Sequence, residues 1–559
     1  MDIQGNIVDI DGRRIFPGTV TVQHGKITAI RERAASFRTE NNVDSFRPYI
    51  LPGFVDAHIH LEMTHLIPSE FAREALAQGT VAALADCHDI AHVLGIKGVE
   101  CLIRDSKKVP FYFGFSAPST TISGLYEFKD VAQLLSRKEV THLGEVQNFP
   151  DVLLHEQYIQ KLLDEAKKAG KPVDGCAPGL SKDRLDEYCV SGISSDHQCT
   201  SLDNAVEKIN HGMSVILQIK KLDSLTSIFP LFKEHGASLM FSGQNMNAAA
   251  IQRGYVNEAV AKTVREGGDL FGVLRAACVT PVRHYGLQCG TLHVGDSADF
   301  IVVNNLEQFA VDATFVKGKC VYSKTPDYHA QKFKFHKMKP VNSFAAKQIS
   351  IGDIQASAVS NSESKSHCCE IKPAVNCISV CDGEMTTVRE VVFLKERNGC
   401  LYSDILNDCC KLVVYDRYKA DAKPAVAFVQ GFGFKKGALA MSVCHDAHNI
   451  IAVGVEDDDI VCAVNKVVSM RGGIAVSVEN KIHAQLPFPV AGLMTDCPFE
   501  QAVKDIDAIF DTLKKEMKGT LVHPLDTLSY LTGPQLPSIK LTPDGIINVV
   551  EQEIIPLVP

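Results

Sequence analysis

The sequence predicts an α/β protein in which a (β/α)8 barrel of the TIM type is accompanied by a small flanking β domain and a C-terminal α+β domain. Three observations lead to this fold class. The chain has 559 residues, which is too long for one ordinary domain. Apolar strands alternate with helical segments over residues 51–287, as they do along a parallel barrel. Shorter β-type runs lie on both sides of this region.

The flanking β domain is predicted from residues 1–50 and 288–337 together. Two runs of alternating apolar and polar residues surround the turn at His24-Gly25, which is typical of a hairpin. Residues 49–56 are interpreted as one continuous apolar strand. Two further strands are expected at residues 299–303 and 313–316. We expect these strands to pair with the N-terminal ones.

Helices of the predicted barrel have recognisable ends. Residues 68–78 should form a helix, because Pro68 suits its first turn and Gly79 follows its end. Residues 158–169 should form another, which Gly170 ends. Strands are expected beside these helices, at residues 80–86 and 141–146.

The last part of the chain is predicted to be a separate domain. Residues 338–366 are polar and rich in serine, so they are interpreted as a linker. Residues 367–559 are expected to form the C-terminal α+β domain. It should contain a strand at residues 450–455 and a helix at residues 499–518.

The composition argues against several functions. The chain has 57 basic and 66 acidic residues and a net charge of −9, so we expect no binding to nucleic acid. It has no apolar stretch of about 18 residues, so we expect no membrane-spanning helix. Residues 1–11 lack the apolar region of a secretory leader. The 18 cysteines are then expected to be reduced, and the protein to be cytoplasmic.

A histidine pair at the end of the first predicted barrel strand indicates a metal site. His58 and His60 follow the segment P-G-F-V-D-A. Residues two apart in a strand point the same way, so both rings can face one metal ion. Barrel enzymes keep their active sites at this end of the strands. Structural histidines are the alternative interpretation.

This segment resembles the metal-binding strand of amidohydrolases, and later motifs narrow the resemblance to adenine deaminases. Four barrel segments are similar to that family's D-P-H-E-I-A, L-G-E-x-x-N-F-P, D-G-H-A-P-G-L and G-I-S-S-D-H. They are residues 86–91 (DCHDIA), 143–150 (LGEVQNFP), 174–180 (DGCAPGL) and 192–197 (GISSDH). The resemblance continues at residues 280–287, 431–440 and 442–450, and therefore covers nearly the whole chain.

The resemblance implies a reaction and a metal centre. Adenine deaminases hydrolyse adenine to hypoxanthine and ammonia through a metal-bound hydroxide. Manganese or iron is the expected divalent metal, and zinc is the alternative. By position, His58 and His60 would hold one metal, His197 would hold the second, and Glu145 would bridge them. The implied partner is a small purine base, adenine, and we also expect a homo-oligomer.

Further residues at the strand ends are candidates for the chemistry. Glu62 and His88 are the candidate catalytic groups, and Asp89 is the candidate for contact with the substrate. A further metal and a plain polar residue at the end of the barrel remain alternatives for His88 and Asp89. A plain polar residue is likewise the alternative for Glu62.

The sequence departs from the family's pattern at two important positions. Cys176 stands where the family has a metal-ligating histidine, so it is either a substitute ligand or a small buried residue. Gly243 is aligned with an aspartate that serves both as a ligand and as the proton shuttle. The following Gln244 and Asn245 cannot accept a proton as a carboxylate does. Other departures are Gln198, in place of Glu, and Tyr418-Lys419, in place of a His-His pair after Arg417.

Three hypotheses follow from this combination. The chain is an adenine deaminase, a catalytically impaired relative that binds a purine or a partner, or an amidohydrolase acting on another cyclic amidine. Losing the shuttle alone would slow the reaction roughly 10²- to 10⁴-fold. The segment around Gly243 therefore separates the hypotheses.

Overall fold

The computed structural model describes residues 1–33, 47–120, 125–326, 328–331, 333–358, 372–445, 447–533 and 538–559. The chain divides into two compact units, each described here by itself. The first comprises Met1–Ala91 and Gly95–His336, and the second comprises His92–Leu94 and Lys337–Pro559. In the described part of the chain, every helix is too short or too polar to cross a membrane.

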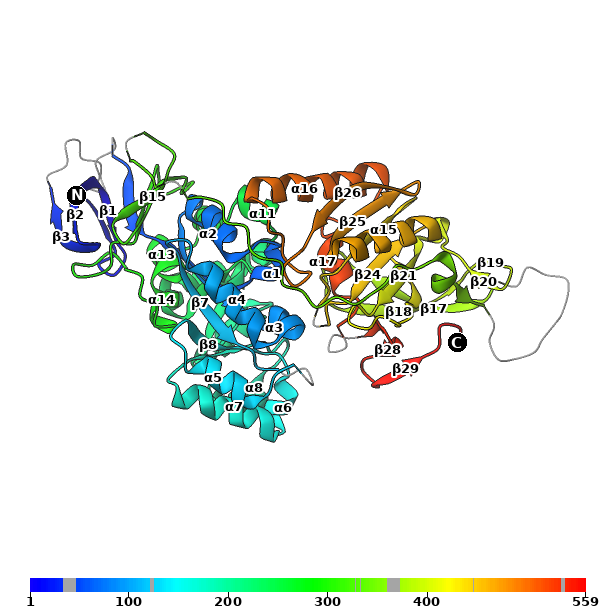
Figure 1. Cartoon of the computed structure of the whole chain (residues 1–559). Coiled ribbons are helices and arrows are strands. Elements are labelled where there is room, and N and C mark those ends of the chain that lie inside the picture. The colour runs from blue at the N-terminus through cyan, green and yellow to red at the C-terminus, as the bar shows by residue number, and fades with distance from the viewer. Residues whose placement is uncertain are drawn as a thin grey trace. The chain divides into compact units, whose positions relative to one another are not determined.

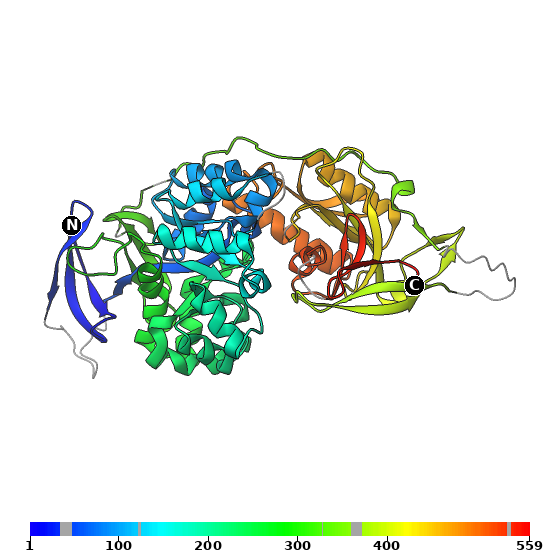
Figure 2. The same cartoon turned by 90° about the horizontal axis from the view of Figure 1, so that it is seen from below.

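A seven-stranded sheet in the first unit combines strands from both sides of the barrel, in the order β15-β14-β13-β4-β1-β2-β3. Figure 2 shows the dark-blue N-terminal strands beside the green ones. Its core contains Ile7, Val20, Ile50, Phe300 and Phe315. The strands are β1 (Asp2–Asp9), β2 (Arg14–Gln23), β3 (Lys26–Glu32), β4 (Tyr49–Pro52), β13 (Phe300–Val303), β14 (Val311–Val316) and β15 (Lys319–Ser323).

The single strand expected at residues 49–56 is wrong, because the structure divides it at Gly53. β4 pairs with β13 in the flanking sheet, whereas β5 (Phe54–His60) pairs with β6 in the barrel. A Cβ atom on Gly53 would overlap the side chain of Val81. Glycine is therefore needed where the chain passes from one sheet to the other.

The predicted (β/α)8 barrel is confirmed: eight parallel strands follow one another in chain order (Figure 1). After β5 come β6 (Thr80–Asp86), β7 (Tyr112–Ala117), β8 (Val140–Val146), β9 (Val173–Gly175), β10 (Ile193–Asp196), β11 (Ser214–Gln218) and β12 (Leu239–Ser242). Backbone hydrogen bonds at Gln244 connect the last strand to the first. The amide of Gln244 donates to the carbonyl of His58 at 3.0 Å, and the amide of His60 donates to the carbonyl of Gln244 at 3.1 Å.

Helices surround the barrel because each has one apolar face. In α7 (Gln157–Lys168), the buried residues Ile159, Leu162, Leu163 and Ala166 recur at helical spacing. The other helices are α1 (Leu61–Thr64), α2 (Pro68–Ala77), α3 (His88–Leu94), α4 (Ile96–Ser106), α5 (Phe128–Leu135), α6 (Phe149–Leu153), α8 (Lys182–Val190), α9 (Leu202–Asn210), α10 (Phe232–His235), α11 (Ala248–Arg253), α12 (Val256–Arg265), α13 (Leu270–Cys278) and α14 (Thr280–His284).

The second unit is built on an eight-stranded mixed sheet in the order β18-β17-β22-β21-β24-β23-β25-β26. Helix α15 (Asp457–Met470) packs on β23, β24 and β25, helix α16 (Phe499–Asp511) packs on the edge strand β26, and a small sheet of β27, β28 and β29 packs on β21 and β22 (Figure 1). The strands are β17 (Ala374–Val380), β18 (Thr387–Phe393), β21 (Cys409–Tyr415), β22 (Ala425–Gln430), β23 (Ala438–Met441), β24 (Ile450–Gly454), β25 (Gly473–Val478), β26 (Lys481–Pro487), β27 (Ile539–Thr542), β28 (Gly545–Asn548) and β29 (Glu553–Ile555). Short elements complete it, namely β16 (Ala356–Ser357), β19 (Glu396–Arg397), β20 (Cys400–Leu401) and α17 (Pro524–Ser529).

The linker expected at residues 338–366 differs from the structure over its described part, which extends to residue 358. Phe344, Ile349 and Ile354 are buried in the main core of the second unit. Because these apolar side chains are part of that core, residues 344–354 belong to the C-terminal domain and are not a linker before it. The remaining residues of the expected linker, 359–366, lie outside the described part of the chain.

Candidate metal centre

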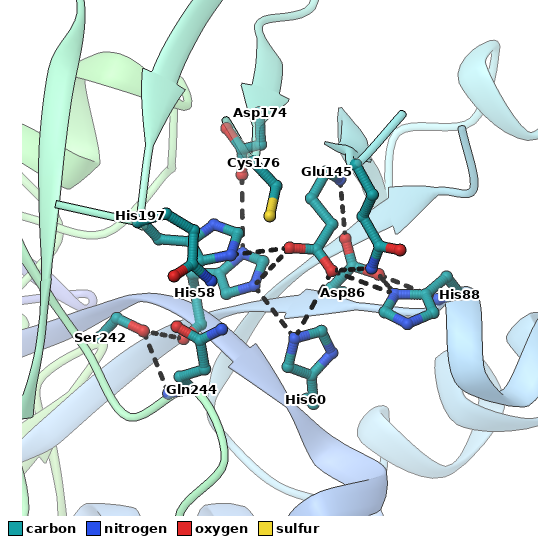
Figure 3. Close-up of polar contacts among 12 residues, drawn as sticks. His58, His60, Asp86, His88, Glu145, Asp174, Cys176, His197, Ser242 and Gln244 are labelled. Carbon is teal, nitrogen blue, oxygen red and sulfur yellow. Dashed lines mark hydrogen bonds and ion pairs between the residues drawn. The ribbon is translucent and has the colours of Figure 1, made fainter. Parts of the chain in front are cut away.

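Polar side chains meet at the C-terminal ends of the barrel strands (Figure 3). β5 provides His58 and His60, and β8 provides Glu145. His197 follows the last residue of β10, and His88 begins α3 just after β6. All five side chains are buried. The strand ends therefore collect residues from widely separated parts of the chain in one place.

The two histidines of β5 face the same point, as the alternation of a strand predicts. Their Nε2 atoms lie 3.3 Å apart. Glu145 lies opposite them, with one carboxylate oxygen 3.9 Å from His58 Nε2 and the other 3.9 Å from His60 Nε2. His197 Nε2 lies 2.8 Å from the Glu145 carboxylate. The structure thus brings together the four residues for which the sequence predicted metal binding.

This cluster has the chemistry of a cation site. Potential ligand atoms of His58, Glu145 and His197 all lie within 4.8 Å of one another. Although His197 Nε2 and Glu145 Oε2 are close, neither forms a hydrogen bond with any residue that the structure describes. Leaving buried polar atoms unpaired costs about 1–3 kcal/mol each. A divalent cation would satisfy such lone pairs, so these residues fit a metal.

Asp174 lies behind His58. Its carboxylate is 3.9 Å from His58 Nδ1 and accepts hydrogen bonds from the hydroxyls of Tyr285, at 2.9 Å, and Ser195, at 2.7 Å. Burial lowers the pKa of His58, but Asp174 and Glu145 outweigh it and raise that pKa to about 9. The same negative field favours a bound cation. Carboxylates behind ligating histidines commonly orient the ring and strengthen the ligand.

Asp86 fixes both Glu145 and His88. One of its oxygens accepts from the backbone and ring nitrogens of His88, at 3.0 and 2.8 Å, and the other accepts from the amide of Glu145 at 3.1 Å. Burial would raise the pKa of Asp86, but the His88 ring holds it well below its usual range. Asp86 was part of a recognised motif, yet sequence reasoning gave it no role.

Asp89 lies between two histidines. Its carboxylate oxygens are 3.6 Å from His60 Nδ1 and 3.3 Å from His88 Nε2. The ligand atoms of these three residues also lie within 4.8 Å of one another. Asp89, predicted to contact the substrate, therefore lies directly against a candidate metal ligand.

Glu62, a candidate catalytic group, is buried in α1, two residues after His60. One of its carboxylate oxygens accepts from the amide of Ile90 at 3.1 Å, which connects α1 to α3. Burial, together with the nearby charge of Asp89, raises the pKa of Glu62 to about 8. The carboxyl group is therefore able to carry a proton near neutral pH.

Cys176 lies beside the cluster, and Figure 3 shows its sulfur directed towards the space between His197 and Glu145. Among the described residues, it does not belong to a group of three close metal-ligating atoms. Burial raises the pKa of its thiol well above the usual value, which favours the neutral form. Its amide donates to the hydroxyl of Tyr188 at 3.2 Å.

The prediction that Gly243 occupies the shuttle position is corrected by the structure. A Cβ atom on Gly243 would lie 2.6 Å from Asp56 Oδ2, and the Gly243 amide donates to that same oxygen at 3.0 Å. Gln244 instead directs its side chain towards His58 and His60 (Figure 3). It is buried, and its Oε1 has no hydrogen-bond partner in the described part of the chain. Gln244 therefore occupies the place where the missing carboxylate was expected.

The alternation of β12 was the signal that could have found Gln244. Met240 packs in the barrel core, whereas Phe241 stacks on Phe232 of a surrounding helix. Met240 therefore faces inwards, and the same even numbering at Gln244 was the available signal, although Gln244 lies two residues beyond the strand and its φ of 40° departs from strand geometry. Gln198, which stands in place of the family's Glu, is buried, and its backbone amide donates to the Asp196 carboxylate at 2.7 Å.

Comparisons with known proteins identify the family. Residues 49–321 match the amidohydrolase family, and residues 384–553 match the adenine deaminase C-terminal domain. The chain is 37% identical to an adenine deaminase of Salinibacter ruber over 557 residues, which cover 98% of this chain and 97% of the relative. It is 35% identical to an adenine deaminase of Methanosarcina barkeri over 563 residues, with 99% and 98% coverage. The chain belongs to the adenine deaminase family of amidohydrolases.

Proposed function

We propose that this chain hydrolyses adenine to hypoxanthine and ammonia at the cluster of His58, His60, Glu145 and His197. The observation that carries the proposal is the meeting of these four buried side chains in a chain similar to adenine deaminases over nearly its full length. Several of their ligand atoms have no hydrogen-bond partner among the described residues. Manganese or iron is the proposed metal, and zinc is the alternative. The substrate is a free purine base, and the protein is proposed to be cytoplasmic and homo-oligomeric.

The metal, when bound, would lower the pKa of a water so that hydroxide is available near neutral pH. Of the protein's own groups, Gln244 cannot accept a proton from that water. Glu62 and His88 are the proposed catalytic groups, because both are buried at the strand ends and can hold a proton near neutral pH. Burial lowers the pKa of His88, but Asp89 and Asp86 outweigh it and raise the pKa well above the usual value. His88 would thus donate a proton to the departing amine.

Two departures from the family's pattern, at Gln244 and Cys176, support a second candidate, a relative that binds a purine without hydrolysing it. Gln244 offers an amide where a carboxylate is expected, and Cys176 offers a neutral thiol where a histidine is expected. Slow hydrolysis of adenine remains the main proposal, because the four remaining ligand residues are together. An amidohydrolase acting on another cyclic amidine is the third candidate.

The test is to prepare the protein separately with manganese, iron and zinc, to count the bound metal, and to follow ammonia release from adenine. His58→Ala should lose both metal and turnover. His293→Ala is the matched control, because its side chain is 48% exposed in the flanking β region. Bound metal with adenine binding but no ammonia would favour the non-catalytic candidate. Bound metal without adenine binding would favour another substrate.

A further inference from the structure

One end of the C-terminal sheet carries polar motifs that the proposed reaction does not use. Tyr415, at the end of β21, pairs with Ile450, and Met441, at the end of β23, pairs with Ile451. The ends of β21 and β23 and the start of β24 therefore meet at the same end of the sheet. The connections beyond them contain Arg417 and the segment that ends at Asn449.

Backbone hydrogen bonds hold Arg417 at this end of the sheet. Its side chain is fully buried, at 0% exposure. Its carbonyl accepts from the amides of Ala345, at 2.7 Å, and Ala346, at 3.1 Å. Its own amide donates to Asn449 Oδ1 at 3.3 Å. The backbone of Arg417 is therefore fixed by contacts with two other segments.

The guanidinium of Arg417 forms no ion pair within the described part of the chain. Nη2 donates to the carbonyl of Ala491 at 2.9 Å, but Nε and Nη1 have no partner among the residues that the structure describes. The neighbouring Asp416 is engaged elsewhere, because its carboxylate accepts from the amide of Tyr418 at 2.8 Å and pairs with Lys419 at 3.3 Å. A buried, unpaired cation is strongly unfavourable, so a compensating group is needed.

Two aromatic rings and Gly492 surround the guanidinium. Its central carbon lies 5.2 Å from the ring centre of Tyr418 and 5.8 Å from that of Phe344. Gly492 lies so close to Nη1 that a Cβ atom there would overlap it. A planar guanidinium fixed in this way loses little freedom when it binds an oxyanion.

We propose that Arg417 anchors an anion-binding site in the C-terminal domain, which takes a small ligand carrying a carboxylate or a phosphate. Arginine is the residue best suited to these groups, because its donors match their oxygens. Buried polar groups without partners also occur where ordered water binds, so water is the outcome that the experiment must exclude.

The test measures binding of inorganic phosphate and of acetate to the full-length protein by equilibrium dialysis, at constant ionic strength. We expect saturable binding of at least one of the anions, at one per chain. Arg417→Met should weaken it roughly 10- to 100-fold. Arg397→Met is the matched control, because Arg397 is an exposed residue of β19 in the same unit, and it should bind as the unmodified protein does. Tight binding of phosphate alone identifies a phosphate site, and tight binding of acetate alone identifies a carboxylate site.

Stability distinguishes an anion site from a structural arginine. If the Arg417 guanidinium binds an anion, phosphate or acetate should raise the Tm of the unmodified protein, and Arg417→Met should abolish that rise. Without anion, the variant should be at least as stable, because it buries no unpaired charge. If Arg417→Met does not fold, Arg417→Lys should still show weakened binding, because lysine lacks the planar donors. Absence of anion binding in the unmodified protein, or equal binding in the variants, would overturn the proposal.

Discussion

Restoring a carboxylate at residue 244 should accelerate the proposed hydrolysis of adenine. Gln244→Glu changes an amide into a carboxylate of nearly the same size, so it needs no new space in a buried site. The side-chain oxygen of Gln244 already lies in the centre without a hydrogen-bond partner among the described residues. The variant would therefore place a proton acceptor at residue 244, where the present chain has an amide.

The expected gain follows from the value of a general acid or base. Such a group contributes roughly 10²- to 10⁴-fold, which lowers the barrier by about 3–5 kcal/mol. We expect kcat to rise towards this range in the metal-loaded variant. The additional negative charge near Glu145 should also strengthen metal binding and reduce the stability of the metal-free form.

The assay is ammonia release from adenine, with the metal content measured on the same samples. Asn245→Asp is the matched control, because it introduces the same charge at the next buried residue. Its rate should stay close to that of the unmodified protein. If Gln244→Glu carries its full metal yet is no faster than this control, proton transfer at residue 244 does not limit the reaction, and the reasoning fails.

Three further changes test the site and the fold. Asp174→Asn should weaken metal binding about 10- to 100-fold, because Asp174 lies behind His58; competition with a chromophoric chelator measures this, and the exposed Asp183→Asn should leave it unchanged. Leu162→Ala removes a fully buried side chain of α7 and should lower the free energy of unfolding by about 2–5 kcal/mol, as urea titration would show. Lys540→Met tests a pH effect: burial lowers the pKa of Lys540 from 10.5 to about 7, so between these values the unfolded chain holds a proton that the folded chain lacks. The stability of the unmodified protein relative to the variant should therefore rise with pH from about 7 to 10, and a constant difference in Tm would contradict this.

The sequence was sufficient where a local pattern determines the structure. His58 and His60 share a face because a strand alternates, and the ends of α7 follow from its apolar spacing and from Gly170. The division at Gly53 was not predictable in the same way, because the residues on both sides of it are apolar. Only the packing of Val81 against Gly53 shows where one sheet ends and the next begins.

The error at Gly243 has a different origin. A shift of one residue in the alignment decides whether Gly243 or Gln244 faces the inside of the barrel. β12 ends at Ser242, before both of these residues, so its pattern does not decide between them. Asp56 contacts the Gly243 amide across 187 residues of sequence, and no local pattern predicts such a pairing. The carboxylates behind the histidines were missed for the same reason, because their partners come from other strands.

The buried acidic residues around the candidate ligands favour metal binding whether or not the protein hydrolyses adenine. Asp86, Asp89, Asp174 and Glu145 are all nearly inaccessible to solvent and lie around the candidate ligands. In the free protein, neighbouring histidines and hydrogen-bond donors partly offset these acids, whereas a divalent cation would offset their charge directly. Removing one partner from a buried ionic cluster typically costs several kcal/mol. Stability of the barrel therefore favours metal binding even if the amide of Gln244 prevents efficient proton transfer. A non-catalytic relative built on this cluster would still be a metalloprotein, so the metal count tests the centre and only ammonia release tests the enzyme.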